Sequence, residues 1–413
     1  KARVGQPEVK LGIPPGAGGT QRLPRLAGAK AALDMIVSGD PVTAQQAVVL
    51  GICDQLIETE LVEGALAFAR EVGQTSSPHR LARDRTVEVE DTELFEAKRK
   101  QIARRARGMR APYACIECVE AAVELPFDDG LAREREIFEV CVVSDESKAM
   151  RHVFFAERAA GKIPGVDKNL ERKQFDSAGV IGAGTMGGGI SMNFANAGIP
   201  VTVVEQDSEL LGKGLSTIQE NYAATVAKGR LTQEKMDERV SLITGSTTLD
   251  SLVDADIVIE AIFEEMPAKK ELFGRLDQCV KPTTVLTSNT SYLDVNEIAD
   301  SIPERKGNVL GTHFFSPANV MRLLEVVRTD SVDKAVLMSV LDLGRRMGKL
   351  PIVSGVCHGF IGNRMLEGYF GEAAIMVEEG AAPEHIDRVM YEFGMAMGPL
   401  AVSDLAGLDI GWA

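Results

Sequence analysis

Val180-Ile181-Gly182-Ala183-Gly184-Thr185-Met186-Gly187 is the stretch of sequence that decides the fold. It follows a short apolar run, carries the spacing Gly-x-Gly-x-x-Gly, and leads into a helical pattern. Gly182 permits the tight turn, Gly184 lets the backbone approach a pyrophosphate, and Gly187 allows helix and strand to pack closely. The helix that follows offers free N–H groups and the positive end of its dipole to phosphates. The stretch therefore predicts the first strand and helix of a dinucleotide-binding fold.

An acidic residue stands where a bound ribose is expected. The run Val201–Glu205 has a strand pattern and ends in Glu205, about 20 residues beyond the glycine-rich turn. A carboxylate at that place accepts hydrogen bonds from a ribose 2′-hydroxyl and repels a 2′-phosphate. The sequence therefore predicts NAD rather than NADP, held by Gly182, Gly184, Met186, Gly187 and Glu205.

Short apolar runs and helical patterns alternate through the rest of this region. The expected strands are 178–181, 201–205, 255–262, 283–287 and 308–311. Such alternation predicts an α/β domain with a parallel sheet wrapped by helices. From about residue 356 the pattern is helical only, which predicts a separate all-α domain.

The N-terminal part of the chain has a different composition and a mostly helical pattern. Residues 1–60 are first rich in Gly and Pro, then helical from Gln21 until Gly39-Asp40-Pro41 breaks the pattern. Thr43 is expected to cap the next short helix. Residues from about 60 to 165 are mostly helical in pattern, and a linker rich in Gly, Pro and Lys follows them.

Length and charge exclude several classes of protein. The 413 residues are too many for one ordinary core and suggest two or three domains. A net charge of −15 argues against nucleic acid as the main partner. No apolar run approaches the ~20 residues that a transmembrane helix needs, and six scattered cysteines indicate a reducing compartment. The chain starts at Lys1 and stops just after an apolar stretch, so we expect both ends to cut through domains.

Two local motifs have an ordinary structural explanation. Cys115 and Cys118 have the Cys-x-x-Cys spacing, but no second pair accompanies them for zinc, so packing in a helix is expected. The basic stretch from Lys98 to Arg107 is expected to be a solvated helix face. A site for the phosphates of CoA is its minor alternative.

His313 and Glu325 are the candidate catalytic pair. His313 follows an expected strand in Gly311-Thr312-His313-Phe314-Phe315-Ser316-Pro317, and Glu325 lies within a second strand after a turn that contains proline. Removing a hydride from an alcohol carbon requires a base for the hydroxyl proton, and histidine suits that role near neutral pH. A buried glutamate beside the ring fixes its tautomer and favours the imidazolium.

With these motifs, residues 176–413 resemble the 3-hydroxyacyl-CoA dehydrogenase family. The resemblance implies that His313 is the catalytic base, that Glu325 is its partner, and that Ser291 and Asn363 bind the substrate. It also implies cofactor contacts for Glu264, Lys269, Ser291 and Ser316. Many members carry Asn in place of Ser316, although serine also occurs among multifunctional members.

Residues 1–60 resemble the second part of the crotonase fold of enoyl-CoA hydratases and isomerases. The resemblance is carried by the stretch from Gly5 to Gly12 and by Gly16-Ala17-Gly18-Gly19-Thr20-Gln21-Arg22-Leu23-Pro24. It implies that Glu8 is a catalytic glutamate. The family's second glutamate and its oxyanion hole would lie upstream of residue 1, so hydration by this chain alone is not expected.

Together the two parts resemble the multifunctional enzymes of fatty-acid β-oxidation, which act on acyl-CoA thioesters as lyase and oxidoreductase. We expect four segments: 1–110 as the C-terminal part of a crotonase domain, 111–174 as a helical linker, 175–355 as the Rossmann domain, and 356–413 as a truncated all-α domain. A thiolase or a second copy of the chain is the candidate partner, with no nucleic acid and no transmembrane segment.

The expected location is a bacterial cytoplasm, and the alternative is a peroxisome. Glu205 in place of Asp and the helical segment 110–160 point toward the peroxisomal branch. Two other functions stay open from the residues alone. One is a Rossmann dehydrogenase for a small hydroxy acid, and the other is a noncatalytic scaffold built from decayed domains.

Overall fold

The structure is a computed structural model that describes residues 2–74, 81–89, 91–163, 165–167 and 169–406. It forms two compact units. The first unit comprises residues 1–156 and 381–413, and the second unit comprises residues 157–380.

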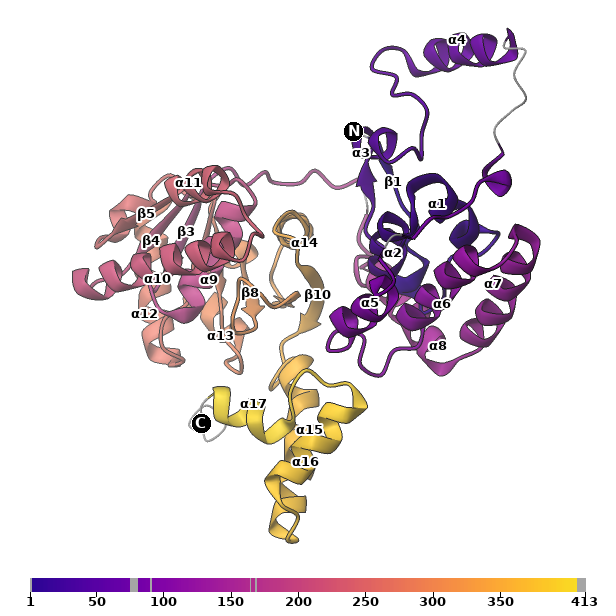
Figure 1. Ribbon diagram of the computed structural model, residues 1–413. Helices are drawn as coiled ribbons and strands as arrows, with labels where there is room; N and C mark the ends of the chain where they lie inside the picture. Colours follow the sequence, from indigo (N-terminus) through magenta and orange to yellow (C-terminus); the bar gives the residue numbers. More distant parts are fainter. Residues whose placement is uncertain (1, 75–80, 90, 164, 168, 407–413) are drawn as a thin grey trace. The chain divides into compact units, whose positions relative to one another are not determined.

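The second unit is built on an eight-stranded sheet with the order β10-β9-β8-β7-β6-β3-β4-β5 (Figure 1). Its strands are β3 (Ala178–Ile181), β4 (Val201–Val204), β5 (Ile243–Ser246), β6 (Ile257–Glu260), β7 (Val285–Ser288), β8 (Val309–Phe314), β9 (Leu323–Arg328) and β10 (Leu350–Gly355). The prediction of a parallel sheet is confirmed except at one place. Strands β8 and β9 run antiparallel, because residues 315–322 connect them without a crossover helix.

Helices cover both faces of this sheet. They are α9 (Thr185–Asn196), α10 (Ser208–Ala227), α11 (Gln233–Ser241), α12 (Met266–Cys279), α13 (Val295–Asp300) and α14 (Lys334–Arg346), with the 3-10 helices η3 (Leu249–Leu252) and η4 (Pro303–Asn308). Helix α15 (Gly362–Glu378) follows β10. The central strands β3 and β6 are buried on both sides, as their continuous apolar runs predict.

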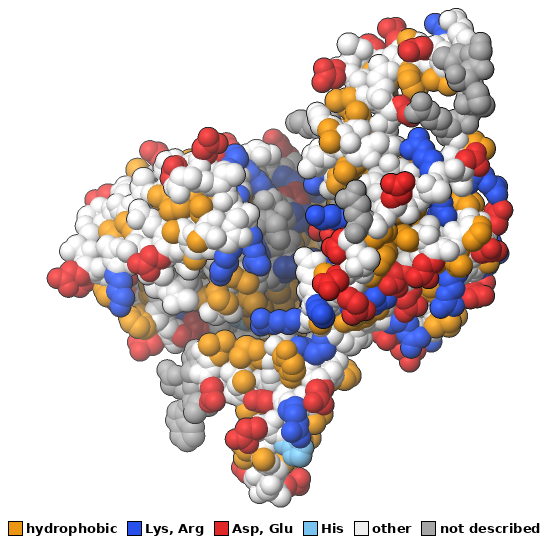
Figure 2. All heavy atoms as spheres, viewed as in Figure 1, with side chains coloured by type: hydrophobic (Ala, Val, Ile, Leu, Met, Phe, Trp, Pro, Cys, Tyr) orange, Lys and Arg blue, Asp and Glu red, His pale blue; other side chains and the backbone are white. Residues whose placement is uncertain are grey.

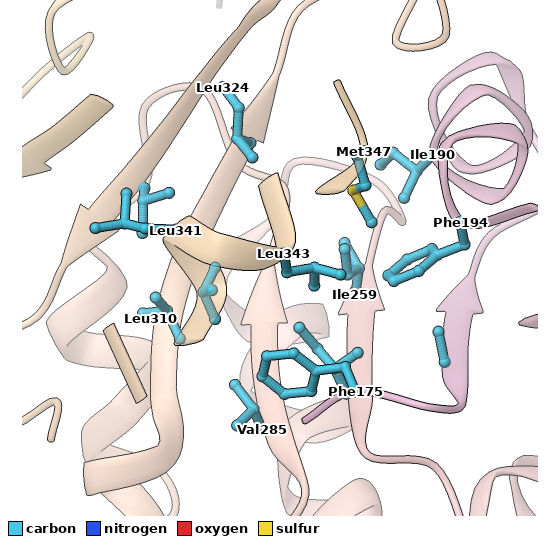
Figure 3. Packing of buried hydrophobic residues seen from close by; sticks show 14 of the residues in the cluster. Phe175, Ile190, Phe194, Ile259, Val285, Leu310, Leu324, Leu341, Leu343 and Met347 are labelled. Carbon is cyan, nitrogen blue, oxygen red and sulfur yellow. The ribbon is translucent and has the colours of Figure 1, made fainter. Parts of the chain in front are cut away.

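Alternate residues of β6 serve two separate hydrophobic cores. Ile257 and Ile259 of β6 lie in a core with Phe194 of α9 and Leu341 of α14. Figure 3 shows part of this packing, including Phe175, Ile190, Phe194 and Ile259 together with Leu341, Leu343 and Met347 from the α14 region. Val258 instead joins the opposite core under α12 and α13. The two cores fix the register of the sheet, since a slip by one residue would exchange its faces.

The first unit is mostly helical. Its elements are β1 (Arg3–Val4), η1 (Glu8–Leu11), α1 (Gly19–Ala27), α2 (Ala29–Ser38), β2 (Val42–Thr43), α3 (Ala44–Val49), α4 (Leu61–Gln74), η2 (Ala82–Asp84), α5 (Leu94–Ile102), α6 (Ala111–Glu124), α7 (Phe127–Val142), α8 (Asp145–Ala160), α16 (Pro383–Phe393) and α17 (Pro399–Ala406). Helix α8 continues into the second unit. Among the described residues, no helix has the length and apolar character needed to cross a membrane.

Helix α6 packs into the core of the first unit. Its residues Cys115, Ile116 and Val119 share one buried cluster with Val9 and with Ile36 of α2. The sequence led us to expect that residues 111–174 form a linker. The structure shows that the first helix of this segment completes the core of the part that resembles crotonase. Cys118 lies on the same helix in a neighbouring buried cluster, so both cysteines pack as apolar side chains.

Local signals set the helix ends in residues 19–49. Thr43 accepts a hydrogen bond from the N–H of Gln46 at 3.2 Å, and the Gln46 side chain accepts one from the N–H of Thr43 at 2.9 Å. This capping box confirms the predicted start of α3. The helix predicted from Gln21 to Gly39 is interrupted at Gly28, whose φ of +83° ends α1 before α2 begins.

Ion pairs account for the start of the basic stretch around helix α5. Lys98 Nζ lies 2.6 Å from Asp34 Oδ1, and Arg99 lies 2.5 Å from Glu120 Oε2. These contacts pair two positive charges with carboxylates, so the two charges are not available to bind a phosphate. Figure 2 shows acidic and basic side chains interspersed over the face in view.

Truncation of Phe194 should destabilise the second unit. This side chain is fully buried in the core under α9, so Phe194→Ala should lower the free energy of unfolding by about 3–5 kcal/mol. Urea unfolding followed by circular dichroism would measure the loss. Phe263, which is 85% exposed in the same unit, provides the control Phe263→Ala, expected to stay within about 0.5 kcal/mol. Equal losses in the two variants would contradict this description of the core.

Candidate active site

The glycine-rich turn between β3 and α9 has the shape that a dinucleotide requires. Gly182 has a φ of +102°, and a Cβ there would lie 2.6 Å from the carbonyl oxygen of Ala261. A Cβ on Gly187 would overlap the carbonyl oxygen of Gly182, so only glycine fits this approach of helix to turn. A Cβ on Gly184 would meet no atom within 4 Å, so the backbone faces open space there. The turn therefore has room for a pyrophosphate at the N-terminus of α9.

Glu205 lies beside this turn at the end of β4. Its carboxylate accepts a hydrogen bond from the N–H of Ala183 at 3.2 Å, which holds it next to the first glycines. Met186, in the first turn of α9, is partly buried and packs against the core under that helix. These residues fit NAD, since the backbone N–H groups suit its phosphates and the carboxylate suits a ribose hydroxyl.

Strands β8 and β9 bring His313 and Glu325 together. The two residues are direct partners in the antiparallel register, and Nδ1 of His313 lies 2.6 Å from Oε2 of Glu325. Both side chains are buried. A carboxylate only accepts hydrogen bonds, so Nδ1 carries a proton, and Nε2 is the nitrogen without a proton when the ring is neutral. The arrangement makes Nε2 available as a base.

The start of α15 completes the surroundings of Glu325. Oε1 of Glu325 accepts hydrogen bonds from the N–H of Ile361 at 3.0 Å and of Gly362 at 2.8 Å. Burial by itself raises the pKa of Glu325, but hydrogen bonds from His313 and from the Gly362 N–H outweigh it, and the net pKa is lowered. Glu325 is therefore held as an anion beside the ring. Asn363 is the second residue of α15 and is partly buried.

The loop after β7 brings Ser291 to the other side of the imidazole. Ser291 Oγ lies 3.3 Å from Nε2 of His313. The rings of Phe315 and Phe360 flank the histidine, with centroids 4.4 and 5.8 Å from its own. Ser316 follows Phe315 and is exposed. The structure thus groups Ser291, His313 and Glu325, three residues from separate stretches of the sequence.

Glu264 and Lys269 belong to a network of ion pairs and hydrogen bonds, of which the sequence predicted only these two members. Lys269 has no exposed surface, and its Nζ lies 2.7 Å from Glu260 Oε1 and 3.3 Å from Glu264 Oε2. Glu264 also accepts hydrogen bonds from the loop that carries Ser291. A direct contact of Lys269 with a cofactor stays a prediction. We did not predict a role for Glu260, although a charged residue at the end of an apolar strand was a visible signal.

Glu8 lies in the first unit at the start of the 3-10 helix η1. The next residue, Val9, anchors this short helix in the core. Oε2 of Glu8 and Oε1 of Gln6 are both buried, and neither atom has a hydrogen-bond partner among the described residues. A buried carboxylate oxygen without a donor is costly unless a ligand or water binds it. This observation fits a carboxylate that handles water or a proton.

A second buried carboxylate in the first unit was missed from sequence. Glu134 on α7 accepts hydrogen bonds from the N–H of Gly18 at 2.7 Å, the N–H of Thr20 at 3.0 Å and the Thr20 hydroxyl at 2.5 Å. It thereby fixes the glycine-rich loop at the start of α1. No local pattern could have paired Glu134 with a loop more than one hundred residues earlier.

Comparison with known families agrees with this site. Residues 177–357 match the family model described as 3-hydroxyacyl-CoA dehydrogenase, NAD binding domain, and residues 359–413 match its C-terminal domain. Residues 1–107 match the enoyl-CoA hydratase/isomerase family. The predicted combination of a crotonase part with a dehydrogenase is confirmed, and so is NAD as the cofactor.

Solved structures and curated relatives define the family. The (S)-3-hydroxybutyryl-CoA dehydrogenase of Ralstonia eutropha is 34% identical with a TM-score of 0.55, over 57% of this chain and 84% of that one. The 3-hydroxybutyryl-CoA dehydrogenase of Escherichia coli is 36% identical with a TM-score of 0.55, over 58% of this chain and 51% of that one. The chain belongs to the 3-hydroxyacyl-CoA dehydrogenase family.

The resemblance to one multifunctional relative extends over the whole chain. The peroxisomal bifunctional enzyme of Danio rerio is 44% identical over 418 aligned positions, which cover 100% of this chain. The chain spans 57% of the length of that relative.

Glu325 should make the stability of the second unit depend on acid pH. Because the folded state lowers its pKa from 4.5, the stabilisation by its anion is present above about pH 4.5 and is lost as pH falls below it. Glu325→Gln should cost about 1–3 kcal/mol near neutral pH. Urea unfolding of both proteins across this pH range should show their difference shrinking in acid.

The matched control is Glu304→Gln, which changes an exposed glutamate of the same unit. Its difference from the parent protein should be near zero at every pH. A gap for Glu325→Gln that stays constant from neutral to acid pH would argue against a stabilising anion at this position.

Proposed function

We propose that this chain is an NAD-dependent 3-hydroxyacyl-CoA dehydrogenase that oxidises the 3-hydroxyl of an acyl-CoA thioester to a ketone. The observation that carries the proposal is the buried His313–Glu325 pair at 2.6 Å, with Ser291 at the free ring nitrogen. Family membership implies the acyl-CoA substrate class, and the part that matches enoyl-CoA hydratase/isomerase supports the same thioester.

His313 supplies the proton transfer in this reaction. Its Nε2 takes the proton of the substrate hydroxyl, and the electron pair of the O–H bond then forms the carbonyl. NAD held at the turn of Gly182, Gly184 and Gly187 would supply the acceptor for the hydride of the same carbon. Glu325 stabilises the imidazolium that results, because its carboxylate already faces Nδ1. Ser291 is the proposed hydrogen-bond donor to the substrate oxygen, and Asn363, in the first turn of α15, is proposed to bind the substrate.

The competing functions receive less support. A dehydrogenase for a small hydroxy acid would have no use for a fused hydratase-like part. A scaffold of decayed domains would have no reason to retain the buried His313–Glu325 pair, two glycines (Gly182 and Gly187) at which a Cβ would clash, and Ser291 at the histidine. We therefore prefer the acyl-CoA dehydrogenase function.

His313→Gln is the first test of this function. The chain is mixed with NAD and 3-hydroxybutyryl-CoA, and NADH absorbance gives the rate. We expect His313→Gln to lower kcat by about 10²–10⁴-fold, because the general base is lost. The affinity for NAD, measured by calorimetry, should change less than about twofold. His385→Gln, on the exposed surface of α16, is the matched control and should keep the parent rate. Full turnover in His313→Gln would reject the assignment.

Enoyl-CoA hydration is a second candidate activity, and it is favoured by the buried Oε2 of Glu8, which has no hydrogen-bond partner in the described part of the chain. In a longer version of this protein, Glu8 would give or take the proton as water adds to the double bond. The chain spans 57% of the length of its Danio rerio relative, so the assay for this reaction uses a longer version of the protein that matches the full length of that relative.

Glu8→Gln should separate the two activities in that longer protein. With crotonyl-CoA and NAD, NADH forms only after hydration, so both Glu8→Gln and His313→Gln should block it. With 3-hydroxybutyryl-CoA and NAD, only His313→Gln should block it. NADH formed from crotonyl-CoA by Glu8→Gln at the parent rate would exclude Glu8 from the hydration.

Segments, partners and location also belong to the proposal. We retain the boundaries at residues 110, 174 and 355 as proposed domain limits, and Glu264 and Ser316 as proposed cofactor-side residues, whereas a direct contact of the fully buried Lys269 with the cofactor stays a prediction. A thiolase partner or a homo-oligomer stays a prediction. The name of the Danio rerio relative favours the peroxisome, which was the alternative location. It gives no support to the bacterial cytoplasm that we expected first.

A further inference from the structure

A fully buried ion pair lies at the carboxyl end of β6. Lys269 of α12 and Glu260, the last residue of β6, are both 0% exposed, and Nζ lies 2.7 and 3.0 Å from the two carboxylate oxygens. Ser288 Oγ donates to Glu260 Oε2 at 2.6 Å, and the N–H of Ile262 donates to Oε1 at 2.8 Å. Burying two charges is expensive unless every lone pair is used, and here the glutamate is fully hydrogen-bonded. Glu260 therefore fixes the position of the ammonium group.

The ammonium group has a second carboxylate partner nearer the surface. Glu264 Oε2 lies 3.3 Å from Nζ of Lys269, and the Glu264 side chain is 39% exposed. The ammonium thus stands between two carboxylates that would otherwise repel each other. Of the two, only Glu264 has access to water.

Glu264 in turn holds the loop after β7. Its Oε1 accepts hydrogen bonds from the Thr290 hydroxyl at 2.5 Å, from the N–H of Ser291 at 2.7 Å and from the N–H of Tyr292 at 3.3 Å. Three donors on one oxygen fix the backbone of this loop. The same loop brings Ser291 Oγ to 3.3 Å from Nε2 of His313.

We propose that Lys269 is a positioning residue that keeps Ser291 at His313 by holding Glu264 in place, with Glu260 as its buried anchor. Its effect on turnover rests on the proposed dehydrogenase function, whereas its effect on the loop does not. Without the ammonium group, Glu264 is repelled by Glu260 and turns toward water. The N–H groups of Ser291 and Tyr292 then lose their acceptor, and Ser291 leaves the imidazole.

The test compares Lys269→Met with Lys270→Met, which removes a neighbouring lysine of the same helix that pairs with Glu297 at 2.7 Å. Amide hydrogen exchange is measured first, without cofactor or substrate. We expect exchange at Ser291 and Tyr292 to accelerate about tenfold in Lys269→Met and to stay unchanged in Lys270→Met. Unchanged exchange in Lys269→Met would overturn the proposal, whatever the enzyme assay shows.

Kinetics separate positioning from direct cofactor contact. For a positioning residue, Lys269→Met lowers kcat about tenfold at saturating NAD and leaves the dissociation constant of NAD within about twofold. For a cofactor contact, NAD binding weakens and kcat at saturating NAD is kept, which would overturn the proposal. If the parent chain has no turnover, the dehydrogenase assignment fails, and the exchange result still decides the role of Lys269 in the loop.

A double-mutant cycle tests the route through Glu264. Glu264→Ala leaves the Glu260–Lys269 pair intact and should release the loop to the same extent as Lys269→Met. Adding Lys269→Met to Glu264→Ala should then change exchange at Ser291 by less than about twofold. If each substitution accelerates exchange at Ser291 by its own factor and the two factors multiply in the double variant, Lys269 does not act through Glu264.

Removing one member of a buried pair can prevent folding, because the other charge is left uncompensated. The double variant Lys269→Met/Glu260→Leu avoids this by replacing the whole pair with apolar side chains. In it, Glu264 has lost its cation and faces apolar groups, so the same faster exchange at Ser291 and Tyr292 is expected. A protected loop in this folded variant would overturn the proposal.

Discussion

The antiparallel pairing of β8 with β9 is the constraint on which the catalytic end of the second unit depends. In a sheet that is otherwise parallel, this one reversal places His313 directly opposite Glu325. A direct cross-strand pair lies within reach of one hydrogen bond, so the register itself brings the imidazole and the carboxylate together. Apolar residues on both sides, such as Leu324 and Val326, lock that register in the core. The pair is therefore as rigid as the sheet.

Buried carboxylates organise the loops around both candidate sites. In the second unit, Glu325 binds the first N–H groups of α15, and Glu260 anchors the lysine that faces Glu264. In the first unit, Glu134 does the same for the N–H groups at the start of α1. A carboxylate offers several acceptor positions at one point, so a single side chain satisfies several backbone donors that would otherwise be costly to bury. Each loop gains a fixed shape from one distant residue.

The attachment of α15 to Glu325 has a consequence for the chemistry. The helix presents its N-terminus, the positive end of its dipole, to the carboxylate that supports His313. The lowered pKa of Glu325 therefore depends on β9, on the histidine and on the first turn of α15 together. The residues that follow β10 are for this reason part of the environment of the base.

Apart from Ser291, which the family resemblance supplied, the sequence by itself predicted the dinucleotide turn, the alternation of strands and helices, and the pair His313 and Glu325. These are local signals: glycine spacing, apolar runs, and a polar residue next to a strand. The predicted strand 178–181 matches β3, because its residues are buried on both faces. The strand β5 was not predicted, since its exposed edge residues Thr244 and Gly245 lack an apolar pattern.

Only the tertiary structure decided which distant residues meet. It reversed the direction of β9, joined α6 to the core of the first unit, and enclosed Lys269 between Glu260 and Glu264. Burial of a charge, the pairing of strands and the docking of a helix all depend on contacts between residues far apart in the chain. Local sequence patterns carry no information about such contacts, so the partners of Lys269 and of Glu134 became visible only in three dimensions.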